Sequence, residues 1–210
     1  SQGNPVNFDY LFDKAQVILD YLRDQEPAGF YSLVKAIPAE TETLAQPWML
    51  GSTGNSALKA GEMGLGYSFA KFFGIEIGPE VFQTYRDHFK PSPFFDQPQV
   101  MASYLIILAD TPEEADRLAR PMEISSISDH KQALRTLDQA QDYTFSPEEE
   151  ALLKEKYDRR FLIKGTPETV KPILRDEIDR YGIDELMAYM PIPDQEARIH
   201  SYDLLYQIFH

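Results

Sequence analysis

Short and almost uninterrupted apolar runs alternate with helix-like segments along this chain, and that alternation limits the folds that it can adopt. The longest run is "QVMASYLIILA" at residues 99–109, and others are "PWML" at 47–50, "GYSFAKFF" at 66–73 and "DELMAYM" at 184–190. Strands that are buried on both faces have such runs, which are typical of a parallel sheet. The pattern therefore predicts an α/β fold with about four β/α units.

Helices are expected between these strands and at both ends of the chain. Residues 8–24, "FDYLFDKAQVILDYLRD", place apolar side chains at roughly helical spacing and predict an amphipathic helix before the first strand. The closing stretch at 194–209 has the same pattern. Four units make half of an eight-stranded α/β barrel, which usually needs ~250 residues. A small open sheet is the other arrangement that these elements allow.

Three helix starts share one local device, a hydroxyl residue at the N-cap, proline at the first helical position and acid in the first turn. They are Thr111-Pro112, Ser146-Pro147 and Thr166-Pro167. Pro172 falls inside the third helix, where it removes one backbone hydrogen bond and should bend the helix near its start. Residues 122–145 are polar and weakly periodic, which indicates an insertion with partial helix inside a single domain of residues 1–210.

The charge and the residue types exclude several classes of function. A net charge of −14 makes nucleic acids and anionic membranes poor partners. The absence of cysteine excludes disulfides, thiolate metal sites and a cysteine nucleophile. The four histidines are scattered without metal-ligand spacing, so no metal is predicted. No secretion signal and no run of ~18 apolar residues is found, and a cytoplasmic location is expected.

A run of small and hydroxyl-bearing residues follows the first predicted strand. The run is Gly51, Ser52, Thr53, Gly54, Asn55 and Ser56, and a helix-like segment comes next. A helix N-terminus offers free amides to an anion, and glycines let a phosphate approach the backbone closely. The run lacks the Walker, dinucleotide-fold and nucleophile-elbow spacings. Phosphate binding and an ordinary strand-to-helix turn are both open at this point.

Two long segments resemble the luciferase-like flavin-dependent monooxygenases. Residues 48–73, "WMLGSTGNSALKAGEMGLGYSFAKFF", are similar to that family's Leu-Gly-Ser-Ser-Gly-x-Ser-Ala segment and the Gly-Leu-x-Phe-Ala that follows it. Residues 163–209 resemble its Gly-Ser-Pro-Glu-Thr-Val segment, its Thr-Gly-Ala-Asp-Glu-Leu-Met strand and its closing helix. Order and spacing agree over most of the chain, with residues 122–143 the least similar.

The resemblance implies a (β/α)8 TIM barrel that binds reduced FMN. By position it makes the six residues from Gly51 to Ser56 the cofactor-binding candidates, around the flavin phosphate. It implies oxidation of an unknown small organic substrate with O2, and a flavin reductase as a possible partner. The cofactor carries out the chemistry in such enzymes, and no residue of this chain is assigned a catalytic role.

The resemblance covers the C-terminal part of the family's barrel, about its last four strands. A half-barrel exposes one face and two strand edges, which is costly unless something covers them. A preceding segment, a second copy in a homo-oligomer or another chain is therefore expected to complete it. Two other functions remain: a non-catalytic flavin-binding or oligomeric module of the same family, and a small open-sheet protein that binds another phosphorylated ligand.

Overall fold

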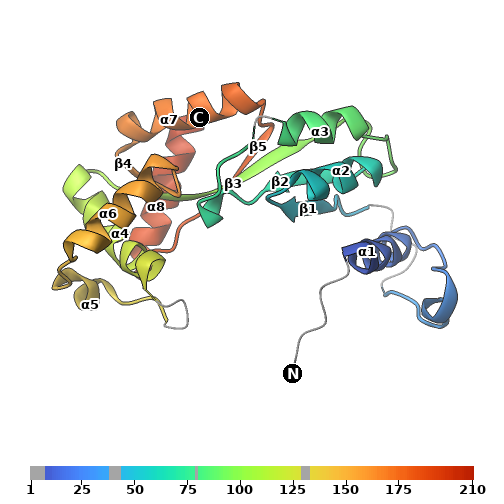
Figure 1. The fold of residues 1–210 in the computed structure, drawn as a ribbon, viewed down its shortest axis with the longest axis horizontal. Helices are drawn as coiled ribbons and strands as arrows, with labels where there is room; N and C mark the ends of the chain where they lie inside the picture. Colours follow the sequence, from blue (N-terminus) through green and yellow to red (C-terminus); the bar gives the residue numbers. More distant parts are fainter. Residues whose placement is uncertain (1–7, 38–43, 79, 129–132) are drawn as a thin grey trace.

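One parallel sheet with helices packed on it forms the core of the structure, a computed structural model that describes residues 8–37, 44–78, 80–128 and 133–210 (Figure 1). The strands are β1 (Trp48–Gly51), β2 (Gly66–Phe69), β3 (Val100–Leu108), β4 (Leu162–Gly165) and β5 (Glu185–Tyr189). The α-helices are α1 (Phe8–Leu22), α2 (Gly54–Glu62), α3 (Val81–His88), α4 (Pro112–Ile127), α5 (Leu137–Gln141), α6 (Pro147–Asp158), α7 (Pro167–Tyr181) and α8 (Gln195–Phe209). Short 3₁₀ helices are η1 (Gly29–Leu33) and η2 (Lys71–Phe73). The predicted parallel α/β class is confirmed.

The longest strand, β3, organises the sheet because it pairs with three other strands. Met101 pairs with both β2 and β5, so these two strands lie on opposite edges of β3. Leu105 pairs with both β4 and β5, so β4 lies on the same edge as β2 and continues its line. The order β1-β2-β3-β5 contains the four predicted strands in sequence order, as neighbouring strands of a barrel would be.

Two details differ from the sequence prediction. The strand β4 was not predicted, because it has four residues and one of them is Lys164, too short and polar for the apolar-run pattern. The run at 66–73 was predicted as one strand, but β2 ends at Phe69 and η2 follows. Gly74 closes this turn with φ of +74°, and Lys71 Nζ donates to the Arg159 carbonyl oxygen at 2.9 Å. The lysine therefore holds the chain away from the strand direction.

The predicted helix starts agree closely with the structure. The hydroxyls of Thr111 and Ser146 accept from the backbone N–H three residues on, at 3.2 and 3.3 Å. At the third start the cap differs, since the Thr169 hydroxyl accepts from the Thr166 N–H at 3.0 Å. Pro172 does lie inside α7. Within 122–145, α4 continues to Ile127 and α5 is present, while residues 129–132 lie outside the described part; the insertion stays a prediction.

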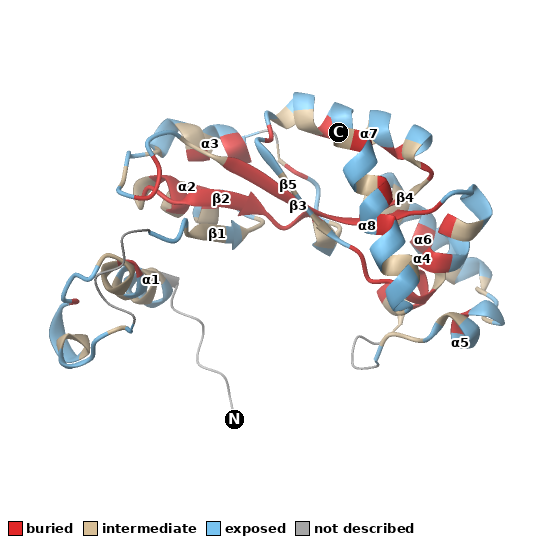
Figure 2. Ribbon diagram, turned by 180° about the vertical axis from the view of Figure 1, so that it is seen from behind, coloured by how far each residue is buried: buried red, intermediate tan, exposed pale blue. Residues whose placement is uncertain are grey.

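The two faces of the sheet differ in what covers them. Side chains alternate between faces along a strand. Tyr67 contacts Phe82 of α3 and Tyr104 contacts α7, so this face carries helices. Leu50, Met187 and Tyr189 point to the other face and are about half exposed. Figure 2 shows that this exposure is confined to the outer strands β1 and β5, since β2 and β3 are buried along their whole length.

Two buried carboxylates tie the helices to the far half of β3. Glu177 of α7 is 3% exposed; it accepts from the Tyr104 hydroxyl at 2.8 Å and also pairs with Arg160. Glu123 of α4 accepts from the Tyr157 hydroxyl at 2.5 Å and pairs with Lys164 of β4 at 2.6 Å. Buried charges are stable only when paired in this way. These contacts anchor α7 to β3, and α4 to both α6 and β4.

We predict that Glu177→Ala lowers the free energy of unfolding by about 2–4 kcal/mol, because it leaves the buried Tyr104 hydroxyl without its acceptor and removes one partner of Arg160. The matched control is Asp176→Ala. Asp176 pairs with the same arginine at 3.1 Å, but its side chain is 45% exposed, so the expected loss is under about 1 kcal/mol. Urea denaturation measures both, and equal losses would contradict the assignment.

Candidate functional site

The small-residue run joins the carboxyl end of β1 to the start of α2. The sequence placed the helix after Ser56, but α2 begins at Gly54, so the last three residues of the run form its first turn. Ligand sites of parallel α/β sheets lie at this end of the strands. The structure therefore brings all six candidate residues together at a position where an anion can meet a helix N-terminus; whether they bind a phosphate stays a prediction.

A capping box closes the start of α2 and explains its early beginning. Thr53 is the N-cap, and its hydroxyl accepts from the Ser56 N–H at 3.5 Å. The Ser56 hydroxyl donates to the Thr53 carbonyl oxygen at 2.8 Å and lies 3.4 Å from the Thr53 nitrogen. Reciprocal contacts of this kind stabilise a first turn. As a result, the Ser56 hydroxyl is directed toward the protein rather than the solvent.

The outward side of the turn presents backbone amides. The first N–H groups of a helix have no partner within it, and the first bond that closes α2 is that from the Ala57 N–H to the Thr53 carbonyl oxygen, at 3.2 Å. The amides of Gly54 and Asn55 precede it. Thr53, Gly54 and Asn55 are exposed, while Ser52 is half-buried. Together with the helix dipole, these groups suit a phosphate or carboxylate.

The two glycines of the run serve different purposes. A Cβ at Gly51 would lie 2.1 Å from the Ser56 hydroxyl oxygen, so a bare backbone is needed there for the capping box to form. A Cβ at Gly54 would meet nothing within 4 Å, and this residue does not have a positive φ. The fold itself therefore does not require glycine at 54. The open space beside its Cα leaves room for a ligand to approach the backbone closely.

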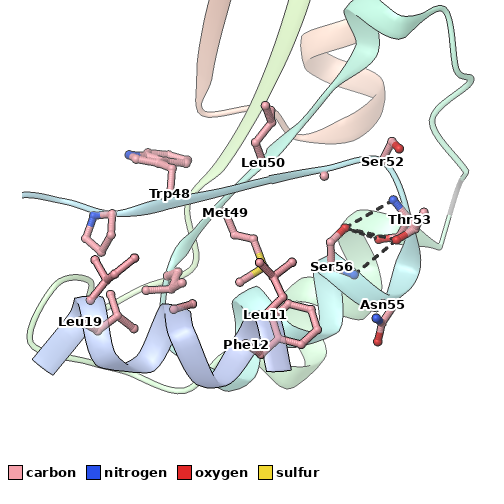
Figure 3. A pocket seen from close by; sticks show the side chains of 15 residues that line it. Leu11, Phe12, Leu19, Trp48, Met49, Leu50, Ser52, Thr53, Asn55 and Ser56 are labelled. Atoms are coloured by element: carbon pink, nitrogen blue, oxygen red, sulfur yellow. Dashed lines mark hydrogen bonds between the residues drawn. The ribbon is translucent and has the colours of Figure 1, made fainter. Parts of the chain in front are cut away.

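An apolar groove adjoins this turn, between α1 and β1 (Figure 3). Its volume is about 510 Å³. Leu11 and Phe12 line it from α1, and Met49 points toward them from β1, while the side chain of Trp48, which is also part of the lining, points to the other side of the strand. The polar end is formed by Ser52, Thr53, Asn55 and Ser56. The groove runs beside a strand edge that pairs with no other strand among the described residues. The groove therefore combines an apolar lining with one polar end.

Several other aromatic and titratable side chains have structural partners. Trp48 packs edge-on against Phe95, with 5.5 Å between ring centroids, and also lines the groove. Phe72 packs against the main core. Asp184 accepts from the Val100 N–H at 2.8 Å and so links β3 to the start of β5. His200 lies 2.9 Å from Asp110 at the surface.

Two contributions to the site were not predicted from the sequence. Helix α1 was expected, but nothing in its pattern indicates that Leu11 and Phe12 would line a groove beside the turn. Tyr67, on β2, places its hydroxyl 3.3 Å from that of Ser56, although the run at 66–73 reads only as a buried strand. In the described ranges, no cluster of three or more potential metal ligands occurs and no helix is long and apolar enough to cross a bilayer.

Comparison with known proteins finds relatives over most of the chain, although no protein-family profile matches it. YceB of Bacillus subtilis (strain 168) is 31% identical over 95% of this chain and 59% of its own length. A luciferase-like monooxygenase of Escherichia coli (strain K12) is 28% identical over 81% of this chain and 51% of its own. The chain thus spans about half to three-fifths of the length of these relatives.

Solved structures agree with the sequence relatives. Apo-MsnO8 superposes with a TM-score of 0.77 at 26% identity, over 95% of this chain and 60% of its own. Two others share the fold at lower identity. The oxygenating constituent of 3,6-diketocamphane monooxygenase of Pseudomonas putida, in complex with FMN, has a TM-score of 0.58 at 17% identity, over 98% of this chain and 63% of its own. The coenzyme F420-dependent tetrahydromethanopterin reductase of Methanopyrus kandleri has a TM-score of 0.55 at 15% identity, over 94% of this chain and 62% of its own.

We predict opposite stability effects for alanine at the two glycines of the run. Gly51→Ala should lower the free energy of unfolding by about 1–3 kcal/mol, because its Cβ overlaps the Ser56 hydroxyl. Gly54→Ala should leave it unchanged or raise it by up to about 1 kcal/mol, because alanine favours the helix and meets no neighbour. Thermal denaturation measures both, and a loss at Gly54 as large as that at Gly51 would contradict this account of the turn.

Proposed function

We propose that the chain belongs to the luciferase-like monooxygenases and that it forms the flavin-phosphate-binding part of an oxidoreductase that uses reduced FMN and O2. The observation that carries the proposal is the start of α2, where Thr53, Gly54 and Asn55 are exposed and an added Cβ at Gly54 would meet no atom within 4 Å. The amides of Gly54 and Asn55 and the side chains of Ser52, Thr53 and Asn55 would hold the phosphate. Reduced FMN, when bound, would supply the electrons for the reaction with O2.

The chain's own groups would bind and shield the cofactor rather than react. Leu11, Phe12 and Trp48 give the groove an apolar lining that excludes water. No acid, base or nucleophile is assigned a catalytic role, and the proposed scheme requires none from this part of the protein. The substrate is a small organic molecule, and reduced FMN would come from a separate flavin reductase. The fold itself does not choose among substrates.

A second part of the proposal concerns the polypeptide that would cover the outer edge of β1. Polypeptide corresponding to the portion that the relatives carry beyond the match would dock on this chain, with one of its strands running parallel to β1. The outer edge of β1 offers unpaired backbone groups, and Leu11 and Ile18 beside it are 53% and 59% exposed. Unpaired edges and apolar patches of this kind favour association. Such docking would enclose the cofactor site, which the alternative of a non-catalytic module does not need.

We predict that the chain binds FMN roughly 100-fold more tightly than riboflavin, because only FMN carries the phosphate that meets the charge-assisted donors of the turn. Trp48 is the only tryptophan and lines the groove, so its fluorescence reports binding. Thr53→Ala should weaken FMN binding about tenfold and leave riboflavin binding unchanged. Thr111→Ala, which removes the same kind of cap from α4, is the matched control and should change neither.

Two outcomes of this titration would count against the proposal. Equal affinities for FMN and riboflavin would show that the turn does not bind the phosphate. Tight binding of coenzyme F420 with no measurable FMN binding would assign the chain to the deazaflavin-dependent relatives. Product formation from candidate substrates by the docked assembly, with reduced FMN and O2, then separates an enzyme from a non-catalytic module.

We predict a one-to-one complex when the portion of the E. coli relative that lies outside the match is added as a separate polypeptide. Size-exclusion chromatography with light scattering measures it. Leu11→Asp with Ile18→Asp should abolish the complex, because it charges the groove beside β1. Leu152→Asp is the control, since Leu152 lies on α6 and is 41% exposed. A homodimer of this chain that excludes the added portion would show instead that a second copy covers the edge.

A further inference from the structure

Three hydrogen-bond donors contact one carbonyl oxygen in the turn from Gly51 to Ser56. The Thr53 carbonyl oxygen accepts from the Ala57 N–H at 3.2 Å, from the Ser56 hydroxyl at 2.8 Å and from the Tyr67 hydroxyl at 3.4 Å. The first two donors come from α2 itself. The third comes from the neighbouring strand β2, 14 residues further along the chain.

Tyr67 is held rigidly in place. Its side chain is 0% exposed, and its ring packs against those of Phe82 and Tyr85 on α3, with centroids 6.0 and 5.6 Å away. Its hydroxyl also lies 3.3 Å from the Ser56 hydroxyl. Burial raises the pKa of the Tyr67 phenol above its usual value, so the hydroxyl keeps its proton and remains a donor at neutral pH.

The direction of this carbonyl decides where the next amide points. A peptide group is planar and trans, so its C=O and its N–H point in opposite directions. The carbonyl of Thr53 and the N–H of Gly54 belong to the same peptide group. Because the Thr53 carbonyl accepts from three donors on the protein side, the Gly54 N–H of the same peptide group points the opposite way, at an exposed residue where even an added Cβ would meet no atom within 4 Å. Hydrogen bonds accepted by the carbonyl also polarise this N–H and strengthen it as a donor.

We propose that Tyr67 is a positioning residue of the phosphate site, which acts through the Thr53 carbonyl to orient the Gly54 N–H toward a bound phosphate. This inference rests on the proposed function for the identity of the ligand. Tyr67 itself does not touch the ligand, because its ring lies on the helix-covered face of the sheet. Gly51 is part of the same arrangement, since its missing side chain gives the Ser56 hydroxyl access to Thr53.

The test compares Tyr67→Phe with Tyr85→Phe in the whole chain. Tyr85 is equally buried and belongs to the same ring cluster, but its hydroxyl donates to the Leu65 carbonyl oxygen and accepts from the Gln99 N–H, both at 2.9 Å. It therefore controls for loss of a buried hydroxyl and for changes in ring packing. With FMN, Tyr67→Phe should raise the dissociation constant about threefold to tenfold and leave that of riboflavin unchanged. Tyr85→Phe should change neither.

Amide NMR of the ligand-free chain gives a readout that does not depend on flavin. In Tyr67→Phe the Gly54 amide proton should shift upfield, because its peptide group loses a polarising donor. In Tyr85→Phe it should stay in place. Inorganic phosphate should shift the Gly54 and Asn55 amides of the wild type, and to a smaller extent those of Tyr67→Phe.

The outcomes separate this inference from the proposed function. A Gly54 amide that is unchanged in Tyr67→Phe, or that moves as much in Tyr85→Phe, overturns the positioning role. Equal loss of FMN and riboflavin binding in Tyr67→Phe also overturns it, since a general structural defect would act on both. If the wild type fails to prefer FMN over riboflavin, the proposed function fails, and the amide shifts with inorganic phosphate still decide the role of Tyr67.

Discussion

The pairing of β3 with three other strands is the constraint on which the rest of the structure depends. All nine residues of β3 are buried, so the strand is covered on both faces and hydrogen-bonded along both edges. Its first half pairs with β2 on one edge and with the whole of β5 on the other, and its second half pairs with β4. Because β2 is the one strand that pairs with β1 among the described residues, the position of the turn from Gly51 to Ser56 at the end of β1 follows from the register that β3 imposes through β2.

That register has a direct consequence for the site. Met49 pairs with Tyr67 across β1 and β2, which puts Tyr67 on the face where α2 and α3 pack. From there its hydroxyl reaches the first turn of α2. A shift of one residue would move Tyr67 to the opposite face of the sheet. The sheet therefore supplies both the location of the turn and the side chain that lies behind it.

The strands β3 and β4 are anchored to helices, whereas the outer edge of β1 pairs with no strand among the described residues. Buried carboxylates anchor helices to two of the strands: Glu177 connects α7 to β3, and Glu123 connects α4 to β4. The outer edge of β1 carries an apolar groove instead. The chain spans 51–59% of the two relatives described above, and the open edge lies where additional strands would extend the order β1-β2-β3-β5. The site and the open edge are adjacent, so completion of the sheet and enclosure of a cofactor would be one event.

The sequence by itself determined the parallel α/β class, the four strands in sequence order, the main helix starts and the candidate turn from Gly51 to Ser56. Local signals sufficed there, because apolar runs, caps and glycines act over a few residues. Only the tertiary structure decided that β4 continues the line of β2, that the Ser56 hydroxyl faces inward and that Tyr67 supports the turn. Each of these depends on groups that are distant in sequence and meet through strand register and packing, which no short segment encodes.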